Sequence, residues 1–414
     1  MKSLKIRLEL NNKQQTLARQ HAGVARHAYN WGVSVCQQAF ERKQKIPSAI
    51  DLHKRLVAEV KTQHQWYYCV SKCAPQQALR NLQSAYRHFH RIQKPTKYNR
   101  RKTIRKSGKP VTILEGLPQF KKKGVRDGFY LEGSIRPDGK RIRLPHLGWV
   151  RCSEALPQTD IKNVSVTRTA DHWFVSFKVP FTPTVTAKTG GTVGVDLGIK
   201  TLATLSDGTA FESVRPYKRH KRKLKLAQRK LSKKFVKGVK QQSKNHRKAQ
   251  AKVARIHARI ACIRVDVLHK LTTHLAKNHS RIVIEDLNVR GMSKNHKLAS
   301  AILDGGFFEF RRQLTYKAGW YGSQVVVADR FFASSKTCCA CGAKKATLKL
   351  SDRTYRCESC GHCQDRDLNA AINLKQYSTV SYTGSACGAL TNPVVSTTGK
   401  AVKQEANNSL NHQV

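Results

Sequence analysis

The sequence predicts a multidomain α/β protein, and three stretches of the chain support that fold class. Residues 192–212 are typical of a buried strand followed by a hairpin that turns at Asp207-Gly208. Residues 13–92 keep the apolar spacing of packed helices. Residues 338–360 contain two Cys-x-x-Cys pairs, each followed by glycine, as in a small metal-binding ribbon. A chain of 414 residues has room for about two to four domains.

The chain is strongly basic. It has 78 Lys and Arg residues against 25 Asp and Glu, which gives a formal charge of +53. This balance predicts a polyanionic partner that is bound along a long path and released by salt. A membrane surface is a weaker candidate because the basic segments lack an apolar face. No apolar run approaches the ~20 residues of a membrane span.

The N-terminus and the cysteines indicate the compartment. Residues 1–8 alternate apolar and charged residues and have no signal-peptide core. Six of the 12 cysteines lie between Cys338 and Cys363, a pattern that favours one metal site over a disulfide framework. We therefore expect a protein of the reducing cytoplasm.

The N-terminal part begins with a strand and continues with helices. Apolar residues at every second position predict a strand at 4–10, and the asparagines at 11–12 predict a helix cap. Helices are expected at 24–40, 48–60 and 74–92. Most aromatic residues of this lobe should pack in the helix core, and a minority should be free to stack on bases. The aromatic residues are Trp66, Tyr67, Tyr68, Tyr86 and Phe89, and the basic residues His88 and Arg91 lie among them in the sequence.

A second group of strands follows a basic segment, 94–107, that has the composition of a linker or of a loop that tracks a nucleic-acid strand. The spacing of these strands favours a small barrel, which could also recruit the opening strand. The Pro-, Thr- and Gly-rich residues 181–191 mark the domain boundary. The expected strands are 111–114, 128–131, 141–144, 164–167 and 173–179.

Residues 213–265 contain no Asp or Glu and 20 Lys and Arg residues. Apolar residues at helical spacing predict a helical hairpin with a thin apolar seam and a cationic surface. Because charge of one sign is so dense, phosphates should supply the balancing charge. The candidate nucleic-acid-binding residues are Lys218, Arg219, Lys221, Arg222, Lys223, Arg229, Lys230, Lys233 and Lys234.

Two strands of the C-terminal half end in a carboxylate. Asp196 follows a β-branched run, and Glu285 follows a continuous apolar run typical of a central parallel strand. Residues 294–306 are expected to form a loop beside the site, 307–320 a helix and 323–329 another buried strand.

A helix that opens at Asp365-Arg366-Asp367 supplies the third acid. Asp365 suits the N-cap position, whereas Asp367 shares a face with Ala370, Ala371 and Leu374, which would let the helix approach a sheet closely. We favour Asp367, and Asp365 is the alternative. Both acids could instead serve only the helix dipole.

Acids on two strand ends and one helix are typical of ribonuclease-H-like nucleases. Carboxylate oxygens can hold two Mg²⁺ ions, one activating water and the other stabilising the leaving oxygen. No Ser-His-Asp set, Walker loop or dinucleotide motif competes with this interpretation.

The two cysteine pairs predict one structural zinc site. Its ligands would be Cys338, Cys341, Cys357 and Cys360, with fifteen residues between the pairs and a glycine after each pair for the turn beneath the metal. Cys339 and Cys363 are alternative ligands, and the glycine positions favour the set without them.

The motifs VGVDLGIK, VIEDLNVRGM, SSKTCCACG, YRCESCG and DRDLNAAINL occur in this order. Together they resemble the TnpB family of insertion-sequence-encoded, RNA-guided DNA nucleases, which are related to type V CRISPR effectors. The resemblance is specific over 192–376 and looser near GVARHAYNW at 23–31. It implies that Asp196, Glu285 and Asp367 form the metal-binding triad of a RuvC-like domain.

The resemblance further implies the partners, the cofactors and the activity. The partners would be a guide RNA and double-stranded target DNA, and the cofactors two Mg²⁺ ions and one structural Zn²⁺. The protein would cut DNA next to a short transposon-associated motif, in a prokaryotic cytoplasm and at the nucleoid when bound. Two other functions stay open, namely a non-cleaving RNA-guided regulator and a DNA transposase.

The same resemblance implies the domain order. A wedge β-barrel (1–12 and 108–183) would contain an inserted helical recognition lobe (13–107). A RuvC-like nuclease domain (190–335 and 364–380) would contain an inserted zinc ribbon (336–363). A disordered tail (381–414) would follow.

Overall fold

The computed structural model describes residues 1–93, 103–106, 109–112, 116–239, 242–348 and 351–383. Its contacts divide the chain into two compact units, Met1–Phe181 and Thr182–Val414. This division falls at the start of the predicted boundary segment, and the finer domain limits stay predictions. Residues 384–414, most of the predicted tail, lie outside the described part.

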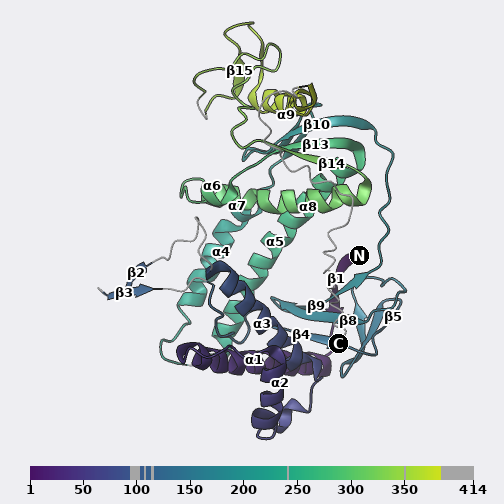
Figure 1. Ribbon diagram of the computed structural model, residues 1–414, viewed down its shortest axis with the longest axis vertical. Helices are drawn as coiled ribbons and strands as arrows, with labels where there is room; N and C mark the ends of the chain where they lie inside the picture. The colour runs from purple at the N-terminus through teal and green to yellow at the C-terminus, as the bar shows by residue number, and fades with distance from the viewer. Residues whose placement is uncertain (94–102, 107–108, 113–115, 240–241, 349–350, 384–414) are drawn as a thin grey trace, which may run out of the picture. The chain divides into compact units, whose positions relative to one another are not determined.

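A seven-stranded antiparallel sheet organises the N-terminal unit (Figure 1), with the order β4-β8-β9-β1-β7-β6-β5. The opening strand β1 lies inside it, between β9 and β7, so the expectation that later strands recruit it is confirmed. No pairing joins β4 to β5 among the described strands, and closure into a barrel stays a prediction. The strands are β1 (Lys2–Glu9), β4 (Gly128–Glu132), β5 (Arg136–Asp138), β6 (Arg141–Leu144), β7 (Gly148–Cys152), β8 (Asn163–Thr169) and β9 (His172–Val179).

Three α-helices lie in the described part of this unit: α1 (Asn12–Glu41), α2 (Ala49–Arg55) and α3 (Cys73–Gln93). The first two begin with reciprocal capping boxes, Asn11 with Gln14 and Ser48 with Asp51, as expected where polar side chains satisfy the first free N–H groups. Leu56–Lys61 continues α2 as a π-helical turn, and Gln65–Tyr67 forms a short 3₁₀ turn.

The aromatic residues of the helices divide as expected. Tyr67, Tyr86 and Phe89 are buried, whereas Trp66 and Tyr68 are exposed. Strands β2 (Thr103–Lys106) and β3 (Lys109–Thr112) pair as a hairpin, so the linker or loop interpretation is wrong for residues 103–106. The rest of the predicted linker and the end of the expected strand 111–114 lie outside the described residues.

The C-terminal unit is built on a five-stranded sheet with the order β12-β11-β10-β13-β14. Strands β10, β13 and β14 are parallel, and β10 to β12 form the predicted antiparallel meander. Strand β14 is an edge strand, and its valines are only half-buried, unlike the fully buried strand that was expected. The strands are β10 (Gly190–Asp196), β11 (Thr201–Leu205), β12 (Ala210–Glu212), β13 (His279–Glu285) and β14 (Gln324–Ala328).

Helices cover both faces of this sheet (Figure 1). Helices α5 (Lys244–Asn278) and α8 (Phe307–Tyr321) share a core with one face, and α9 (Arg366–Thr383) packs on the other. Helix α9 continues to Thr383, so residues 381–383 of the predicted tail are helical.

The expected loop at 294–306 is partly helical. Helix α6 (Val289–Met292) precedes it, and α7 (Ala299–Gly305) lies within it with Ile302 and Asp304 buried. The loop expectation is therefore wrong for 299–305, where a buried apolar side chain and a buried acid hold the helix in place.

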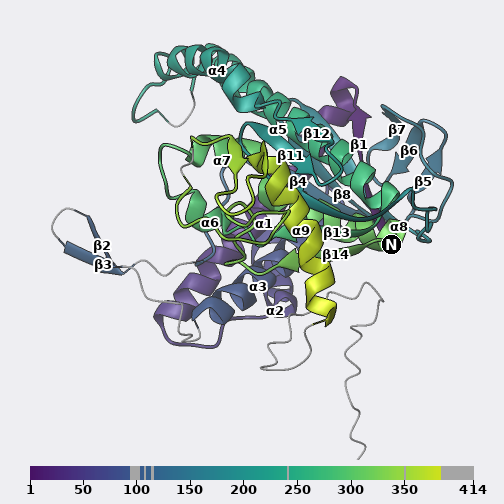
Figure 2. The same ribbon diagram turned by 90° about the horizontal axis from the view of Figure 1, so that it is seen from above.

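The basic segment forms the predicted helical hairpin, α4 (Pro216–Ser232) against α5, and α4 projects from the body of the unit (Figure 2). Its seam consists of Leu224, Ala227, Ile256 and Ile260. The cysteine-rich segment adds a small hairpin of β15 (Thr354–Arg356) and β16 (Cys363–Asp365).

Candidate functional site

The alternation of side chains along two strands directs both strand-end acids toward α9. On β10, Val193 and Val195 pack into the core beneath α5 and α8, so Gly194 and Asp196 face the opposite side. On β13, Val283 packs with Leu374 of α9, and Glu285 is two residues further along the same face. Val195 lies opposite Ile284 in the parallel ladder, so Asp196 and Glu285 leave adjacent strands side by side.

Helix α9 approaches this face at Gly194. A β-carbon at position 194 would overlap the carbonyl oxygen of Ala371 and would lie 2.5 Å from the backbone nitrogen of Lys375. Only glycine therefore permits this helix-to-strand contact. Asp367 lies one turn before Ala371 on α9, and Ala370, Ala371 and Leu374 are buried, as the helix-face prediction requires.

The negative charge of the three acids is only partly balanced, by Arg366, which pairs with Asp367 at 3.2 Å. Burial raises the pKa of Asp196 well above its ordinary value, and the negative charges of Glu285 and Asp367 raise that pKa further. Arg366 opposes this shift but does not reverse it. A carboxylate whose charged form is disfavoured by neighbouring carboxylates is a hard oxygen donor that a divalent cation would stabilise.

The acids next to the site have other partners. Burial alone would raise the pKa of Asp286, but hydrogen bonds from Arg311 and Arg330 outweigh it and hold that pKa below its ordinary value. The Asp365 carboxylate accepts hydrogen bonds from the backbone N–H groups of Asp367 and Leu368 at 2.9 and 3.1 Å. The N-cap expectation for Asp365 is thereby confirmed. Its negative charge also raises the pKa of Asp196, and the choice of Asp196, Glu285 and Asp367 as the site stays a prediction.

Sequence reasoning missed the polar side chains that tie the cysteine ribbon to this site. Ser334 is buried and donates a hydrogen bond to Oε1 of Glu285 at 2.6 Å. Asn369 and Asn373 of α9 are buried and bind the backbone at Ser334, Thr337 and Cys339. Asparagine is unfavourable inside a helix. Two asparagines spaced four residues apart on one helix face could therefore have indicated a polar contact there.

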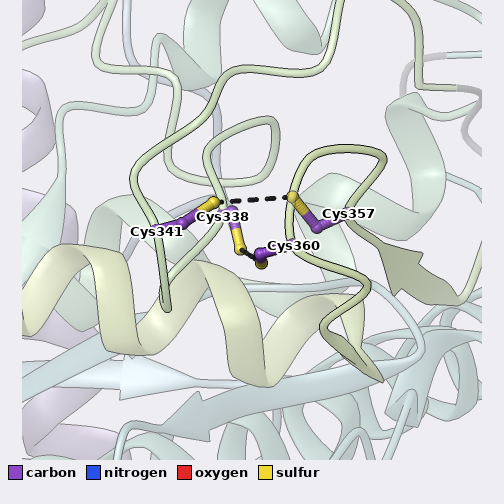
Figure 3. A group of neighbouring side chains, drawn as sticks. All are labelled: Cys338, Cys341, Cys357 and Cys360. Atoms are coloured by element: carbon purple, nitrogen blue, oxygen red, sulfur yellow. Dashed lines mark hydrogen bonds between the residues drawn. The ribbon is translucent and has the colours of Figure 1, made fainter.

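The four predicted zinc ligands lie together (Figure 3). One sulfur atom from each of Cys338, Cys341, Cys357 and Cys360 lies within 4.8 Å of the others. The Cys338–Cys360 and Cys341–Cys357 sulfur pairs are 3.7 and 3.6 Å apart. Four thiolates held about 2.3 Å from a tetrahedral ion would be roughly 3.8 Å apart, so the cluster fits zinc.

The ribbon backbone explains why these four cysteines meet. The glycines after the two pairs, Gly342 and Gly361, adopt positive φ angles of 76° and 73°. Their N–H groups donate to the carbonyl oxygens of Cys338 and Cys357. The two alternative ligands are outside the cluster: Cys339 contacts His362 and Gln364, and Cys363 is exposed.

Replacing Cys357 with serine should remove the bound zinc. A serine hydroxyl is a poor ligand for zinc, and three thiolates hold a structural zinc ion far less tightly than four. Metal analysis of the purified protein should fall from one zinc per chain to well below half. Cys363→Ser is the matched control and should keep its zinc; an equal loss in both variants would contradict the ligand assignment.

The nine candidate nucleic-acid-binding residues, Lys218 to Lys234, are all exposed on α4 or just beyond its end. No acid of the described residues forms an ion pair with any of these nine side chains. The geometry therefore leaves their charge available to an external polyanion.

One buried acid anchors the base of this helix. The Asp304 carboxylate accepts hydrogen bonds from the N–H groups of Tyr217 and Lys218 at the start of α4, and pairs with Arg264 of α5 at 3.0 Å. Since α4 has no side-chain cap of its own, Asp304 both caps it and fixes it to α5.

Replacing Asp304 with alanine should therefore destabilise the hairpin. We expect a loss of about 3 kcal/mol, the lower end for breaking a buried pair, because Arg264 is partly exposed. Thermal unfolding of the full chain measures this. Asp266→Ala, which removes an exposed pair with Lys270 on the same helix, should cost less than about 1 kcal/mol. Equal melting temperatures for the two variants would contradict the anchoring role.

Known proteins resemble this chain over almost its whole length. A family profile described as "Probable transposase" matches residues 169–296, and one described as "Cas12f1-like, TNB domain" matches 307–374. A Streptomyces pristinaespiralis protein named as an RNA-guided DNA endonuclease is 37% identical over 92% of this chain and 90% of its own. The chain belongs to the TnpB family. An Escherichia coli strain K12 protein that is named as the RNA-guided DNA endonuclease InsQ is 32% identical over 98% of this TnpB-family chain and 97% of its own.

A solved structure shares the fold. The Cas12f1 protein, solved as a complex with guide RNA and target DNA, superposes with a TM-score of 0.51 and 12% identity, over 90% of this chain and 98% of that one. A profile described as "Helix-turn-helix domain" matches residues 1–45 of the TnpB-family chain. In the structure these residues form β1 and the single helix α1. Within its described part, no helix is both apolar and long enough to span a bilayer.

Proposed function

We propose that this TnpB-family protein is an RNA-guided DNA endonuclease with a RuvC-like site formed by Asp196, Glu285 and Asp367. The observation that carries the proposal is that these acids lie on one side of the sheet, close enough for the negative charges of Glu285 and Asp367 to raise the pKa of Asp196. The names of the relatives support the guide RNA and the DNA substrate.

The three carboxylates suit two Mg²⁺ ions because they offer only hard oxygen donors. Bound Mg²⁺ would supply an activated water and stabilise the leaving oxygen of the phosphodiester. The protein's own part is to hold the three acids at fixed positions: Asp196 and Glu285 through the register of β10 and β13, and Asp367 through the contact of α9 with Gly194. The four cysteines would hold one structural Zn²⁺.

The exposed cations of α4 are the proposed contact for nucleic-acid phosphates. Each phosphate contact releases counterions, so binding should weaken steeply with salt. Base pairing between the guide RNA and the target would supply the sequence choice, next to a short transposon-associated motif. We further propose that the protein acts in the prokaryotic cytoplasm, at the nucleoid.

The test is to express the protein with its own locus, purify it and sequence the RNA that stays bound. A library of double-stranded targets with random flanks is then added with Mg²⁺. We expect cuts only in targets that match the retained RNA and carry one flanking motif, and replacing the guide segment should move the cut. Cutting that ignores the RNA would overturn guidance.

The same assay separates the two other candidate functions. Specific binding without cutting would indicate a regulator, and joined DNA ends would indicate the transposase that the family description names. We expect neither product.

A further inference from the structure

Ser334 contacts one of the proposed metal ligands directly. Its hydroxyl donates to Oε1 of Glu285 at 2.6 Å, and the side chain is 3% exposed. A hydroxyl-to-carboxylate bond of this length is charge-assisted and is among the stronger hydrogen bonds in proteins. It occupies one lone pair of one oxygen, so the carboxylate keeps acceptor positions for a cation.

Ser334 is itself held by α9, the helix that carries Asp367. The Asn373 amide donates to the carbonyl oxygens of Ser334 and Thr337, both at 2.7 Å. Asn369 donates to the Thr337 carbonyl at 2.8 Å and accepts from the Cys339 N–H at 3.0 Å. Residues 334–339 are thus fixed to α9 at both ends, and they include Cys338, the first cysteine of the zinc-binding cluster.

A purely structural role would not require the bond to Glu285. The two asparagines satisfy their amides on backbone groups, which is what burial of a polar side chain demands. The Ser334 hydroxyl, however, donates to a carboxylate 49 residues away rather than to a nearby carbonyl. The adjacent Ser335 is half-buried and is not part of this network among the described contacts.

We propose that Ser334 is a positioning residue that orients Glu285 for divalent-cation binding, and that Asn373 fixes Ser334 in place. The segment 334–339 then couples the order of the cysteine ribbon to the acid site. This inference rests on the proposed function of Asp196, Glu285 and Asp367.

The experiment measures Mn²⁺ binding to the full-length protein with its RNA by electron paramagnetic resonance, together with zinc content and melting temperature. Ser334→Ala should weaken Mn²⁺ binding about 10-fold to 100-fold, the usual effect of losing a partner of a metal ligand. Excess Mn²⁺ should restore much of the cutting. Ser334→Thr keeps the hydroxyl and should bind Mn²⁺ more tightly than Ser334→Ala, and Ser335→Ala should match the wild type.

Three outcomes would overturn the inference. They are Mn²⁺ binding by Ser334→Ala within two-fold of wild type, no recovery in Ser334→Thr, and zinc loss in Ser334→Ala, which would place the effect in the ribbon. Failure of the proposed function is distinct: wild type would then bind Mn²⁺ no more tightly than Glu285→Gln and would not cut.

Discussion

Replacing Asp196 with alanine should abolish DNA cutting and leave RNA and target binding unchanged. The negative charges of both Glu285 and Asp367 raise the pKa of Asp196, so its loss removes the central ligand of the proposed cation site. We expect cutting to fall by at least about 10³-fold, the upper end of what loss of one electrostatic stabiliser costs elsewhere. Single-turnover cleavage and a gel-shift assay measure the two effects separately.

The acids at the start of α9 provide the control for this prediction. Asp367→Ala should behave like Asp196→Ala. Asp365→Ala removes a helix cap, which costs about 1 kcal/mol, and should keep most of the activity. If Asp196→Ala still cuts, or if Asp365 matters and Asp367 does not, the site assignment is wrong.

Replacing Gly194 with alanine should displace α9 and lower both stability and cutting. The added methyl group would overlap the Ala371 carbonyl and approach the Lys375 nitrogen, and backbone atoms cannot move aside as a flexible side chain can. We expect a loss of about 3 kcal/mol, the upper end for overpacking. Because Asp367 moves with the helix, cutting should fall by more than the folded fraction does. Melting temperature and cleavage rate at a temperature where the variant is folded measure both.

Gly191 offers a matched control on the same strand. A β-carbon there would meet nothing within 4 Å, so Gly191→Ala should leave stability and cutting close to wild type. Gly194→Ala with an unchanged melting temperature would show that α9 does not press on β10 as described.

The features that the sequence predicted correctly are those with a local pattern. An acid at the end of an apolar strand, as at Asp196 and Glu285, is visible within a few residues, and the alternation of side chains then fixes which face the acid shares. The cysteine pairs are equally local because tetrahedral geometry and the turn glycines fix their spacing. No local pattern of this kind predicts binding of a guide RNA. That expectation came from the resemblance to the TnpB family.

Contacts made by single polar residues over long sequence distances were not predictable. The hydroxyl of Ser334 and the acid of Asp304 have no periodicity, and their partners lie 49 and 87 residues away along the chain. The expected loop at 294–306 failed for the same reason, since its helix depends on a buried acid whose partners are on α4 and α5. The short strands β5 and β7 were missed because each carries too few apolar positions to show an alternation.

The most direct test of the central claim is a crystal structure of the protein with its RNA, uncut target DNA and Mn²⁺, analysed by anomalous scattering. We predict two peaks about 3.5–4 Å apart, as in other two-metal sites, bound by Asp196, Glu285 and Asp367 beside the target phosphodiester. Carboxylates that do not converge on a shared ion, or peaks bound by other residues, would contradict the account.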